Sequence, residues 1–458
     1  HQVDERQSAY GSAAWYLAPF YYSETGIAQC LARLAQVKPF QLELEKIPKI
    51  GEGMGLTIEQ EKAVRTALQH PVSILTGGPG TGKTTCLKAL IDLLEKQGKA
   101  YALVSPTGRA AKRLAEATAK PASTIHRLLG YSPKEGFKYH AEHPLPVAFL
   151  IVDEVSMLDM VLAYALLRAL RPGTHVLLVG DVDQLPSVGA GDVLRDLIDS
   201  GRFPVTKLTQ IFRQTAGSQI ITNAHRINHG EMPLFQSGDS TSADFFLFPA
   251  ETAEEAAQWV EEVVCRRIPA RFGFEPRQQI QVLSPMYKGA AGVSALNSRL
   301  QSILNPPSPK KGEKILFGQL FRVGDKVMQT QNNYDKNVYN GDIGWIKAIN
   351  PQENTLTVVF DGRPITYDWS EGDQLALAYA VSVHKAQGSE FPAVVIPILT
   401  SHYMMLQRNL LYTAVTRAQK LCVLVGSKRA IGIAIRNDKV AQRFTALDWR
   451  LRIELGKD

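Results

Sequence analysis

The sequence has little cysteine, and its four cysteines are widely scattered at Cys30, Cys86, Cys265 and Cys422. No CxxC pair and no Cys/His cluster is present, which argues against a structural zinc site and a disulfide framework and favours a reducing compartment. No apolar run reaches the length needed to cross a membrane, and no signal peptide is visible. We therefore expect a cytoplasmic protein without a membrane partner.

A strong charge of one sign is also absent, because 51 Lys and Arg residues are opposed by 44 Asp and Glu residues, which leaves a net charge of +7. Such a mild basic bias is compatible with a polyanionic partner but does not require one. At 458 residues the chain is too long for one hydrophobic core, so we expect two main domains with smaller insertions. The first residue is His1, so we also expect upstream residues that this sequence does not contain.

The N-terminal part of the chain has a helical pattern. Residues 10–46 are rich in Ala, Leu and Gln, with apolar residues at helical spacing. Residues 47–55 contain Pro48 and three glycines and are typical of a linker. We predict that residues 1–50 form a helical packing segment followed by this linker.

A repeated strand–helix pattern follows. Short apolar runs, each followed by a polar turn and a helical pattern, occur at residues 72–75, 102–104, 149–152 and 176–179. This alternation predicts an α/β fold with a parallel sheet covered by helices on both faces. In such sheets the functional groups lie at the carboxyl ends of the strands. We assign the first domain to residues 51–201, with a hairpin insertion at about 131–147.

A second α/β domain is predicted for residues 202–312 and 372–458. Its strand-like runs are residues 205–208, 280–283, 394–398 and 421–425. Between its halves, residues 313–371 have a different pattern of short β runs separated by turn signals such as Asn340-Gly341 and Asp361-Gly362. These runs, at residues 326–331, 343–349, 355–360 and 364–367, predict a small β-barrel inserted into the second domain.

The strongest motif is a glycine-rich phosphate loop. Residues 77–84 match GxxxxGK[ST] and lie directly after a predicted strand and before a predicted helix. Lys83 would reach the β- and γ-phosphates of ATP, and Thr84 would hold Mg²⁺. The expected nucleotide-binding residues of the loop are Gly78, Pro79, Gly80, Thr81, Gly82, Lys83, Thr84 and Thr85. The alternative is a tight strand–helix turn with a chance lysine, and the full motif in this context favours the phosphate loop.

Acidic and amide side chains follow two other strands. Asp153 ends the run at residues 149–152, where it would hold Mg²⁺, and Glu154 is placed to activate an attacking water. Gln184, after the run at 176–179, is a candidate sensor of the γ-phosphate. Each of these pieces alone could be a solvated turn, and it is their combination with the phosphate loop that favours a catalytic role.

From about residue 56 to residue 426 these segments resemble the superfamily 1 helicases, and within them the RecD-like branch of the RecD2 type. The matching segments are residues 56–60 (Q motif), 105–111 (motif Ia), 123–130, 208–214 (motif IV), 383–390 (motif V) and 411–418 (motif VI). The resemblance implies two RecA-like P-loop NTPase domains, with a small β-hairpin insertion in the first and an SH3-like barrel in the second. It also implies ATP and Mg²⁺ as cofactors.

The resemblance extends to individual residues. It implies that Gln60 recognises adenine, that Gly388 and Glu390 belong to the nucleotide site, and that Arg213 and Arg417 are arginine fingers on the γ-phosphate. The candidate contacts with single-stranded DNA are Pro106, Thr107, Thr124, His126, Ser382 and His384. For each of these the alternative is helix capping or a hydrogen bond within a loop.

The function implied is an ATP-dependent DNA helicase that moves 5′ to 3′ on single-stranded DNA, unwinds duplexes and serves repair or recombination near the bacterial nucleoid. Its partners would be single-stranded DNA, junctions of single- and double-stranded DNA and a single-strand-binding protein. The predicted hairpin, with Tyr131, Phe137 and Tyr139, would separate the strands, or it is an ordinary surface loop.

Other functions remain open at this point. The chain could be a RecD subunit of a helicase–nuclease complex, the helicase part of a conjugative relaxase, or a P-loop ATPase that is not a helicase. ATPase activity stimulated by single-stranded DNA separates the last of these from the others.

Overall fold

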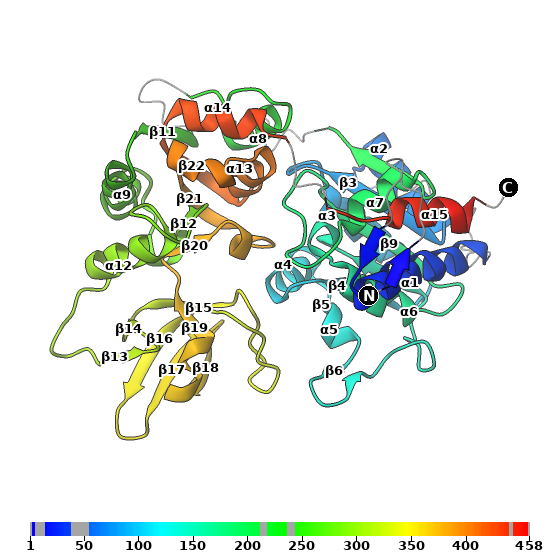
Figure 1. The fold of residues 1–458 in the computed structure, drawn as a ribbon, viewed down its shortest axis with the longest axis horizontal. Helices are drawn as coiled ribbons and strands as arrows, with labels where there is room; N and C mark the ends of the chain where they lie inside the picture. Colours follow the sequence, from blue (N-terminus) through cyan, green and yellow to red (C-terminus); the bar gives the residue numbers. More distant parts are fainter. Residues whose placement is uncertain are drawn as a thin grey trace. The chain divides into compact units, whose positions relative to one another are not determined.

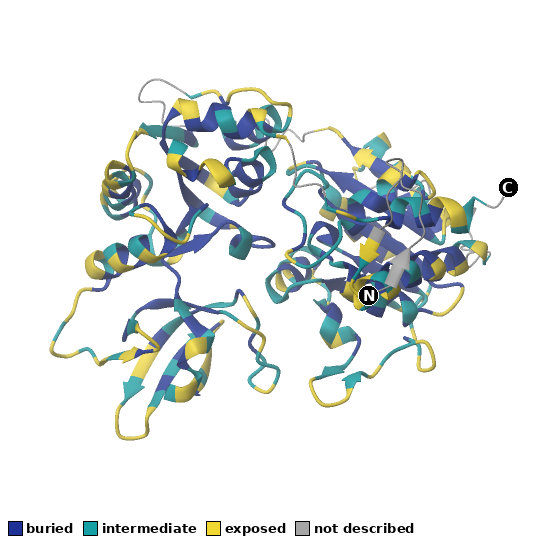
Figure 2. Ribbon diagram, in the orientation of Figure 1, coloured by how far each residue is buried: buried dark blue, intermediate teal, exposed yellow. Residues whose placement is uncertain are grey.

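The computed structural model describes residues 2–4, 14–37, 55–210, 218–235, 243–438 and 443–456. The chain forms two compact units, one of His1–Phe212 with Ala441–Asp458 and one of Arg213–Val440. Each contains a parallel sheet with helices around it (Figure 1). The buried residues concentrate in the strands of these sheets (Figure 2). Within the described ranges, no helix is long and apolar enough to span a bilayer.

The first unit has a six-stranded sheet in which every neighbouring pair is parallel, in the order β10-β3-β9-β8-β4-β5. Its strands are β3 (Val72–Gly77), β4 (Tyr101–Ser105), β5 (Ser123–Thr124), β8 (Phe149–Val152), β9 (His175–Gly180) and β10 (Val205–Leu208). The four strands predicted for the first domain are confirmed. The placement of residues 205–208 in the second domain was wrong, because β10 pairs in parallel with β3 and extends the first sheet.

Alternate residues of the central strands β3, β9, β8 and β4 pack into two separate hydrophobic cores. On β8, Leu150 and Val152 join a core with α1 (Ala18–Gln36), α6 (Met160–Arg168) and α7 (Val193–Ser200). Phe149 and Ile151 join a second core with α2 (Ile58–Gln69) and α3 (Lys83–Lys96). Burial of both faces explains why the strands are continuous apolar runs.

The two ends of the chain both belong to the first unit. The prediction of helix throughout residues 10–46 was only partly right, since α1 is the helix described and β2 (Ala14–Tyr16) pairs with β1 (Gln2–Asp4). The prediction that residues 441–458 belong to the second domain was wrong. Their helix α15 (Leu447–Leu455) places Leu447 and Leu451 in the core beside α1.

Polar contacts fix this C-terminal segment. The guanidinium group of Arg443 donates hydrogen bonds to the carbonyl oxygens of Ser187 and Gly191 on the loop after β9. Arg450 Nε donates to Glu24 Oε1 of α1 at 2.8 Å, and both side chains are nearly buried. An ion pair of this kind is costly to break, because removal of one partner leaves a buried charge.

A carboxyl group beside this segment predicts a pH-dependent stability. Burial raises the pKa of Asp196 on α7 to about 7, with further contributions from Asp192, Asp448 and Glu24 and an opposing hydrogen bond from Thr445. The folded chain therefore holds this proton more tightly than the unfolded chain, and the free energy of unfolding falls as pH rises from about 4 to about 7.

Replacement of Asp196 by Asn should remove this loss while keeping an oxygen that accepts the hydrogen bond from Thr445. We expect the unfolding temperature of the first unit, measured by calorimetry on the full chain, to rise by at least about 3 °C at pH 8. The gain should disappear near pH 4. An equal gain at both pH values would show that the variant acts through packing and not through ionisation.

The second unit has a five-stranded parallel sheet in the order β11-β22-β21-β12-β20. Its strands are β11 (Phe245–Pro249), β12 (Ile280–Ser284), β20 (Ala380–Ser382), β21 (Phe391–Ile398) and β22 (Ala418–Gly426). Its α-helices are α8 (Gln219–Asn228), α9 (Ala253–Glu262), α10 (Ile268–Phe272), α11 (Pro276–Gln279), α12 (Val293–Leu304), α13 (Arg408–Val415) and α14 (Lys428–Arg436). The three runs predicted at 280–283, 394–398 and 421–425 all form strands of this sheet.

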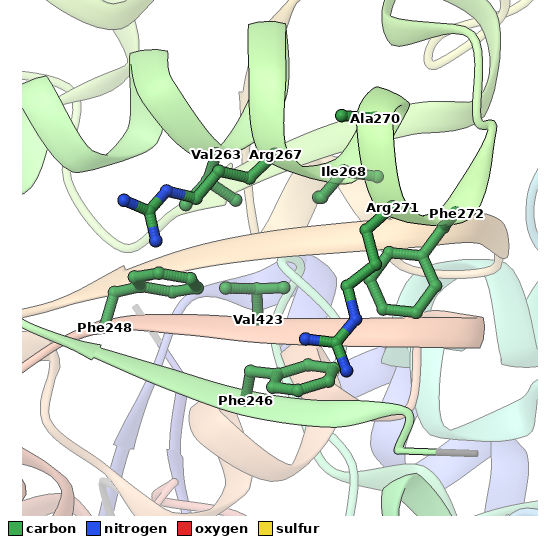
Figure 3. A pocket seen from close by; sticks show the side chains of 9 residues that line it. All are labelled: Phe246, Phe248, Val263, Arg267, Ile268, Ala270, Arg271, Phe272 and Val423. Carbon is green, nitrogen blue, oxygen red and sulfur yellow. The ribbon is translucent and has the colours of Figure 1, made fainter. Parts of the chain in front are cut away.

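An apolar cavity of about 310 Å³ lies against the edge strand β11. Figure 3 shows Phe246 and Phe248 on one side of it and the arginines of the covering helical segment on the other. The guanidinium carbon of Arg267 lies 5.2 Å from the ring centre of Phe248, and that of Arg271 lies 5.3 Å from the ring centre of Phe246. The arginine stems thus cover apolar surface while their charged ends stay near solvent.

The inserted barrel is confirmed, and its bounds are extended. An antiparallel sheet has the order β18-β17-β16-β15-β19, and a separate hairpin pairs β13 with β14. The strands are β13 (Glu313–Leu316), β14 (Gln319–Arg322), β15 (Lys326–Gln329), β16 (Ile343–Asn350), β17 (Thr355–Phe360), β18 (Arg363–Asp368) and β19 (Leu375–Leu377). Asp361 and Gly362, the predicted hairpin turn between β17 and β18, have φ angles of +50° and +79°. The last strand lies beyond the predicted end at residue 371.

The barrel is attached to the parallel sheet of the second unit through a buried carboxylate. Asp325 is fully buried and accepts hydrogen bonds from Gln301 Nε2 at 2.6 Å, Asn305 Nδ2 at 2.7 Å and Tyr379 Oη at 3.0 Å. Gln301 lies in the last turn of α12, Asn305 caps the C-terminus of that helix, and Tyr379 precedes β20. A buried charge is stable only when it is fully hydrogen-bonded, so this network fixes the barrel to the second sheet.

Candidate functional site

The loop after β3 has the shape needed to surround a phosphate. Gly80 and Gly82 have φ angles of +73° and +89°, a region that favours glycine. A Cβ atom at Gly77 would lie 2.7 Å from Thr81 Oγ1 and 3.0 Å from the carbonyl oxygen of Leu208, so no side chain fits there. The loop leads directly into α3, whose N-terminal amide groups face an anion favourably.

Lys83 is the first residue of α3 and folds back over this loop. Its Nζ atom donates to the carbonyl oxygens of Gly77 at 2.6 Å and Gly78 at 3.0 Å. The ammonium group is therefore held where phosphate oxygens would lie. Thr84 and Thr85 follow on the first turn and are exposed. The predicted residues thus lie in the loop between β3 and α3 and in the first turn of α3.

The predicted carboxylates lie at the end of β8, which is separated from β3 by β9 alone. Burial, followed by the neighbouring charge of Glu154, raises the pKa of Asp153 to about 6, whereas Arg113 and Lys83 oppose this rise. Glu154 is nearly buried and Asp153 is partly buried, and two adjacent carboxylates in such a place favour a cation beside them. The donor set of Asp153 and Thr84 therefore fits a hard divalent cation such as Mg²⁺.

Glu154 forms a contact with Arg113 that the sequence did not reveal. Arg113 Nη2 on α4 (Gly108–Thr118) lies 2.5 Å from Glu154 Oε1. Glu154 is nearly buried and has a φ of +56°, which is uncommon for a residue with a side chain. The separation of 41 residues between the partners leaves no local sequence pattern that could have predicted the pair.

The third group follows β9. Gln184 Nε2 donates to Asp181 Oδ2 at 3.2 Å, and the backbone N–H of Asp183 donates to the other carboxylate oxygen at 3.2 Å. Asp181 is buried, so it fixes the loop that carries Gln184. The structure therefore brings Lys83, Glu154 and Gln184 to the carboxyl ends of β3, β8 and β9, which are neighbours in the order β3-β9-β8.

The predicted adenine-binding residue, Gln60, lies in the first turn of α2. Gln60 forms a capping box with Thr57, in which Gln60 Oε1 accepts from the Thr57 N–H at 3.1 Å. Its Nε2 atom is buried and has no hydrogen-bond partner among the residues that the structure describes. An unsatisfied buried donor is unfavourable, and an acceptor on a purine base would satisfy it.

Helix α2 also contacts Thr209, which lies a few residues before Arg213 in the sequence. Glu59 accepts hydrogen bonds from the backbone N–H of Thr209 at 2.9 Å and from its hydroxyl at 2.8 Å. These bonds lower the pKa of Glu59. Arg213 itself lies outside the described residues, so its predicted role stays a prediction.

The candidate DNA contacts of the first unit lie at the far edge of the same sheet. Pro106 and Thr107 follow β4, and Thr124 ends the neighbouring strand β5. The hydroxyl of Thr107 accepts from the N–H of Ala110 at 3.3 Å, and that of Thr124 accepts from the N–H of Arg127 at 3.2 Å. Both residues therefore cap helices, but each hydroxyl keeps its own O–H, which can still donate to a phosphate.

His126 packs against the predicted hairpin. Its ring centre lies 5.5 Å from that of Tyr131 and 5.8 Å from that of Phe137, and burial lowers its pKa. The hairpin is formed by β6 (Tyr131–Ser132) and β7 (Gly136–Phe137). Its aromatic residues thus anchor it to the unit, and the exposed tip at residues 133–135 carries a proline and two charged side chains.

The candidate DNA contacts of the second unit lie together at the end of β20. Ser382 accepts from the N–H of Lys385 at 3.3 Å, and its hydroxyl lies 3.4 Å from that of Tyr287. Burial lowers the pKa of His384. Tyr287 is half exposed and was missed from the sequence, because an isolated tyrosine after a strand carries no pattern.

Motif V also touches the barrel, and motif VI touches motif V. Lys385 Nζ donates to Asn340 Oδ1 at 2.7 Å on the turn before β16. Arg417 is nearly buried, and its Nη1 donates to the carbonyl oxygen of Ser389 at 3.2 Å. Gly388 has a φ of +71°, and the exposed Glu390 accepts from the side chain of Gln419. The finger role of Arg417 and the nucleotide contacts of Gly388 and Glu390 stay predictions.

Three protein-family models match consecutive parts of the chain. They are the AAA domain over residues 60–190, the SH3 domain of ATP-dependent RecD-like DNA helicases over 296–360 and the C-terminal domain of UvrD-like helicases over 377–425. The first match covers the P-loop and the carboxyl ends of β3, β4, β5, β8 and β9. The second covers most of the barrel.

Relatives that this chain covers over most of their own length show which family it belongs to. The RecD subunit of the RecBCD enzyme from Mycolicibacterium smegmatis is 30% identical over 95% of this chain and 82% of its own length. The chain belongs to the RecD-like family of superfamily 1 helicases. The RecD subunit of RecBCD from Mycobacterium tuberculosis H37Rv is 32% identical over 86% of the chain and 73% of its own length. The family resemblance inferred from the motifs is thus confirmed.

A further RecD-like relative is longer than this chain. The ATP-dependent RecD2 DNA helicase of Deinococcus radiodurans is 42% identical over 87% of the chain, which spans only 53% of that protein. Among solved structures, one of Pif1 helicase, described as a structural basis for DNA unwinding at forked double-stranded DNA, is similar with a TM-score of 0.50 and 24% identity, over 81% of this chain and 92% of that one. This likeness shows a shared fold, with two RecA-like sheets and an inserted barrel.

Proposed function

We propose that the chain is an ATP-dependent DNA helicase that moves 5′ to 3′ along single-stranded DNA and unwinds duplexes for repair or recombination. The observation that carries the proposal is the arrangement of candidate groups along the carboxyl ends of the strands in the first sheet. Candidate nucleotide groups at the ends of β3, β9 and β8 adjoin candidate DNA groups at the ends of β4 and β5. ATP turnover and strand binding can then affect one another through a single rigid sheet.

In this proposal the first unit supplies the hydrolytic groups. Lys83 binds the β- and γ-phosphates of ATP, Glu154 takes a proton from the attacking water, and Gln184 senses the γ-phosphate. Thr84 and Asp153 hold Mg²⁺, which would neutralise charge that develops on the phosphates. Arg213 and Arg417 of the second unit act as arginine fingers, in keeping with the family.

The DNA contacts would come from both units. Thr107, Thr124 and His126 in the first and Ser382 and His384 in the second would bind phosphates or sugars without reading base sequence. The hairpin at residues 131–137 would separate the strands of the duplex at a junction. Alternate binding by the two units during each ATP cycle would move the protein along the strand.

The test is unwinding of two duplexes, one with a 5′ and one with a 3′ single-stranded tail, by the full chain with ATP and Mg²⁺. We expect unwinding of the 5′-tailed duplex alone. Unwinding of the 3′-tailed duplex alone would keep the motor and overturn the direction. An enzyme whose ATP turnover ignores single-stranded DNA would overturn the proposal as a whole.

A second function is favoured by the RecD subunits, of which this chain covers 82% and 73%. Each of those relatives is named as a subunit of the RecBCD enzyme. ATP turnover stimulated by single-stranded DNA, without unwinding of either tailed duplex, would support a subunit that needs partner proteins.

A further inference from the structure

The roles proposed for the hydrolytic groups give no reason for the ion pair between Arg113 and Glu154. The two side chains meet at 2.5 Å, and the carboxylate side chain is only 7% exposed. Glu154 also starts the short 3-10 helix Val155–Met157 with its backbone in the left-handed region. Its main chain and its carboxylate are therefore both held in one orientation.

Arg113 belongs to the helix that begins at the candidate DNA contact. The N-terminal cap of α4 is Thr107, and Arg113 follows on the next turns of the same helix. The strands before these groups are neighbours, since Val104 of β4 is in register with Val152 of β8. The N–H of Asp153 donates to the carbonyl oxygen of Val104 at 2.9 Å. One helix thus connects the end of β4 to the carboxylate at the end of β8.

A carboxylate held by a guanidinium group is fixed in one direction. Arg113 donates to Oε1 of Glu154, so this oxygen is directed at the arginine and not at an attacking water. A general base must instead accept a hydrogen bond from the attacking water. The observed pair is therefore the arrangement of a restrained base.

We propose that Arg113 is a positioning residue that restrains Glu154 until single-stranded DNA binds at the N-terminus of α4. A DNA phosphate at the Thr107 end is attracted by the positive end of the helix and shifts α4. This shift separates Arg113 from Glu154 and releases the carboxylate toward the water. The inference rests on the proposed function and names the device by which DNA would control turnover.

The experiment compares ATP turnover of the full chain with and without saturating single-stranded DNA. Replacement of Arg113 by Ala should raise kcat without DNA by about tenfold, because one charge-assisted hydrogen bond no longer restrains Glu154. The kcat with DNA should stay within about twofold of the parent, so the stimulation ratio falls by about tenfold. The KM for ATP should not change, since Arg113 does not belong to the phosphate loop.

Two matched variants separate restraint from loss of positive charge. Arg113→Lys keeps a cation that can reach Glu154, and it should restore low turnover without DNA. Lys112→Ala removes a charge from the adjacent, half-exposed position, whose partner in the structure is Glu116 on the same helix. It should leave the stimulation ratio unchanged. In the double variant Arg113→Ala, Glu154→Gln the gain in turnover should vanish if it passes through Glu154.

Two results would overturn the inference while leaving the helicase proposal intact. One is an Arg113→Ala protein with low turnover in the absence of DNA and full stimulation in its presence. The other is an equal loss of both rates that Lys restores, since Arg113 would then hold Glu154 in its active position. If the parent chain itself shows no stimulation by DNA, the proposed function fails, and this inference fails with it.

Discussion

Replacement of Lys83 by Ala should reduce ATP hydrolysis by at least about a thousandfold, with or without single-stranded DNA. The ammonium group lies over the phosphate loop, 2.6 Å from the carbonyl oxygen of Gly77 and 3.0 Å from that of Gly78. It would offset charge on the β- and γ-phosphates in both the bound state and the transition state. The variant should therefore lose nucleotide affinity as well as turnover, measured by titration with a fluorescent ATP analogue and by phosphate release.

The same helix offers a matched control. Lys88 is an exposed lysine of α3, and its replacement by Ala removes the same charge away from the loop. We expect that variant to turn over ATP within about twofold of the parent. If Lys83→Ala kept turnover near the parent rate, the assignment of the nucleotide site to residues 77–85 would be wrong.

The arrangement of the candidate nucleotide groups could be predicted from the sequence because most of them are local. The glycines lie in the loop between β3 and α3, and Lys83 and Thr84 are the first residues of α3, so their spacing along the chain fixes their arrangement in space. Asp153 and Gln184 needed one further step, namely that parallel strands place their carboxyl ends at one edge of the sheet. The structure bears out that step through the order β3-β9-β8.

The remaining features depend on contacts between residues far apart in sequence. The run at 205–208 has the pattern of any buried strand, and only its pairing with β3 assigns it to the first sheet. The helix at Leu447–Leu455 belongs to the first unit because Leu447 and Leu451 fill a core next to α1. Arg113 likewise looks like an ordinary exposed helix residue until β4 and β8 lie side by side.

The hairpin shows the same limit at the level of single side chains. Its aromatic content is compatible with a strand-separating function or with an ordinary surface loop. In the structure the ring centres of Tyr131 and Phe137 lie 5.0 Å apart, and both rings also pack against His126. These aromatic side chains therefore anchor the hairpin to the first unit. Composition can indicate that an insertion is ordered, but it does not show which of its residues would meet DNA.

Replacement of Glu154 by Gln should separate catalysis from nucleotide binding. Gln has nearly the same size but cannot take a proton from the attacking water, so kcat should fall by about a hundredfold to a thousandfold. The affinity for ATP should stay within about threefold of the parent, because Glu154 is not expected to contact the phosphates in the ground state. Binding of the fluorescent ATP analogue and single-turnover hydrolysis measure the two quantities independently.

The carboxylate also pairs with Arg113, so the variant could lose activity through a disturbed fold. Glu116→Gln on α4 is the control, because it removes an exposed carboxylate from the helix that carries Arg113. It should leave both kcat and thermal unfolding unchanged. Should Glu154→Gln lose ATP affinity as severely as Lys83→Ala, Glu154 would be a ligand of the bound nucleotide and its cation. The Arg113 contact would then orient a ligand, and DNA would control nucleotide binding instead of the proton transfer to Glu154.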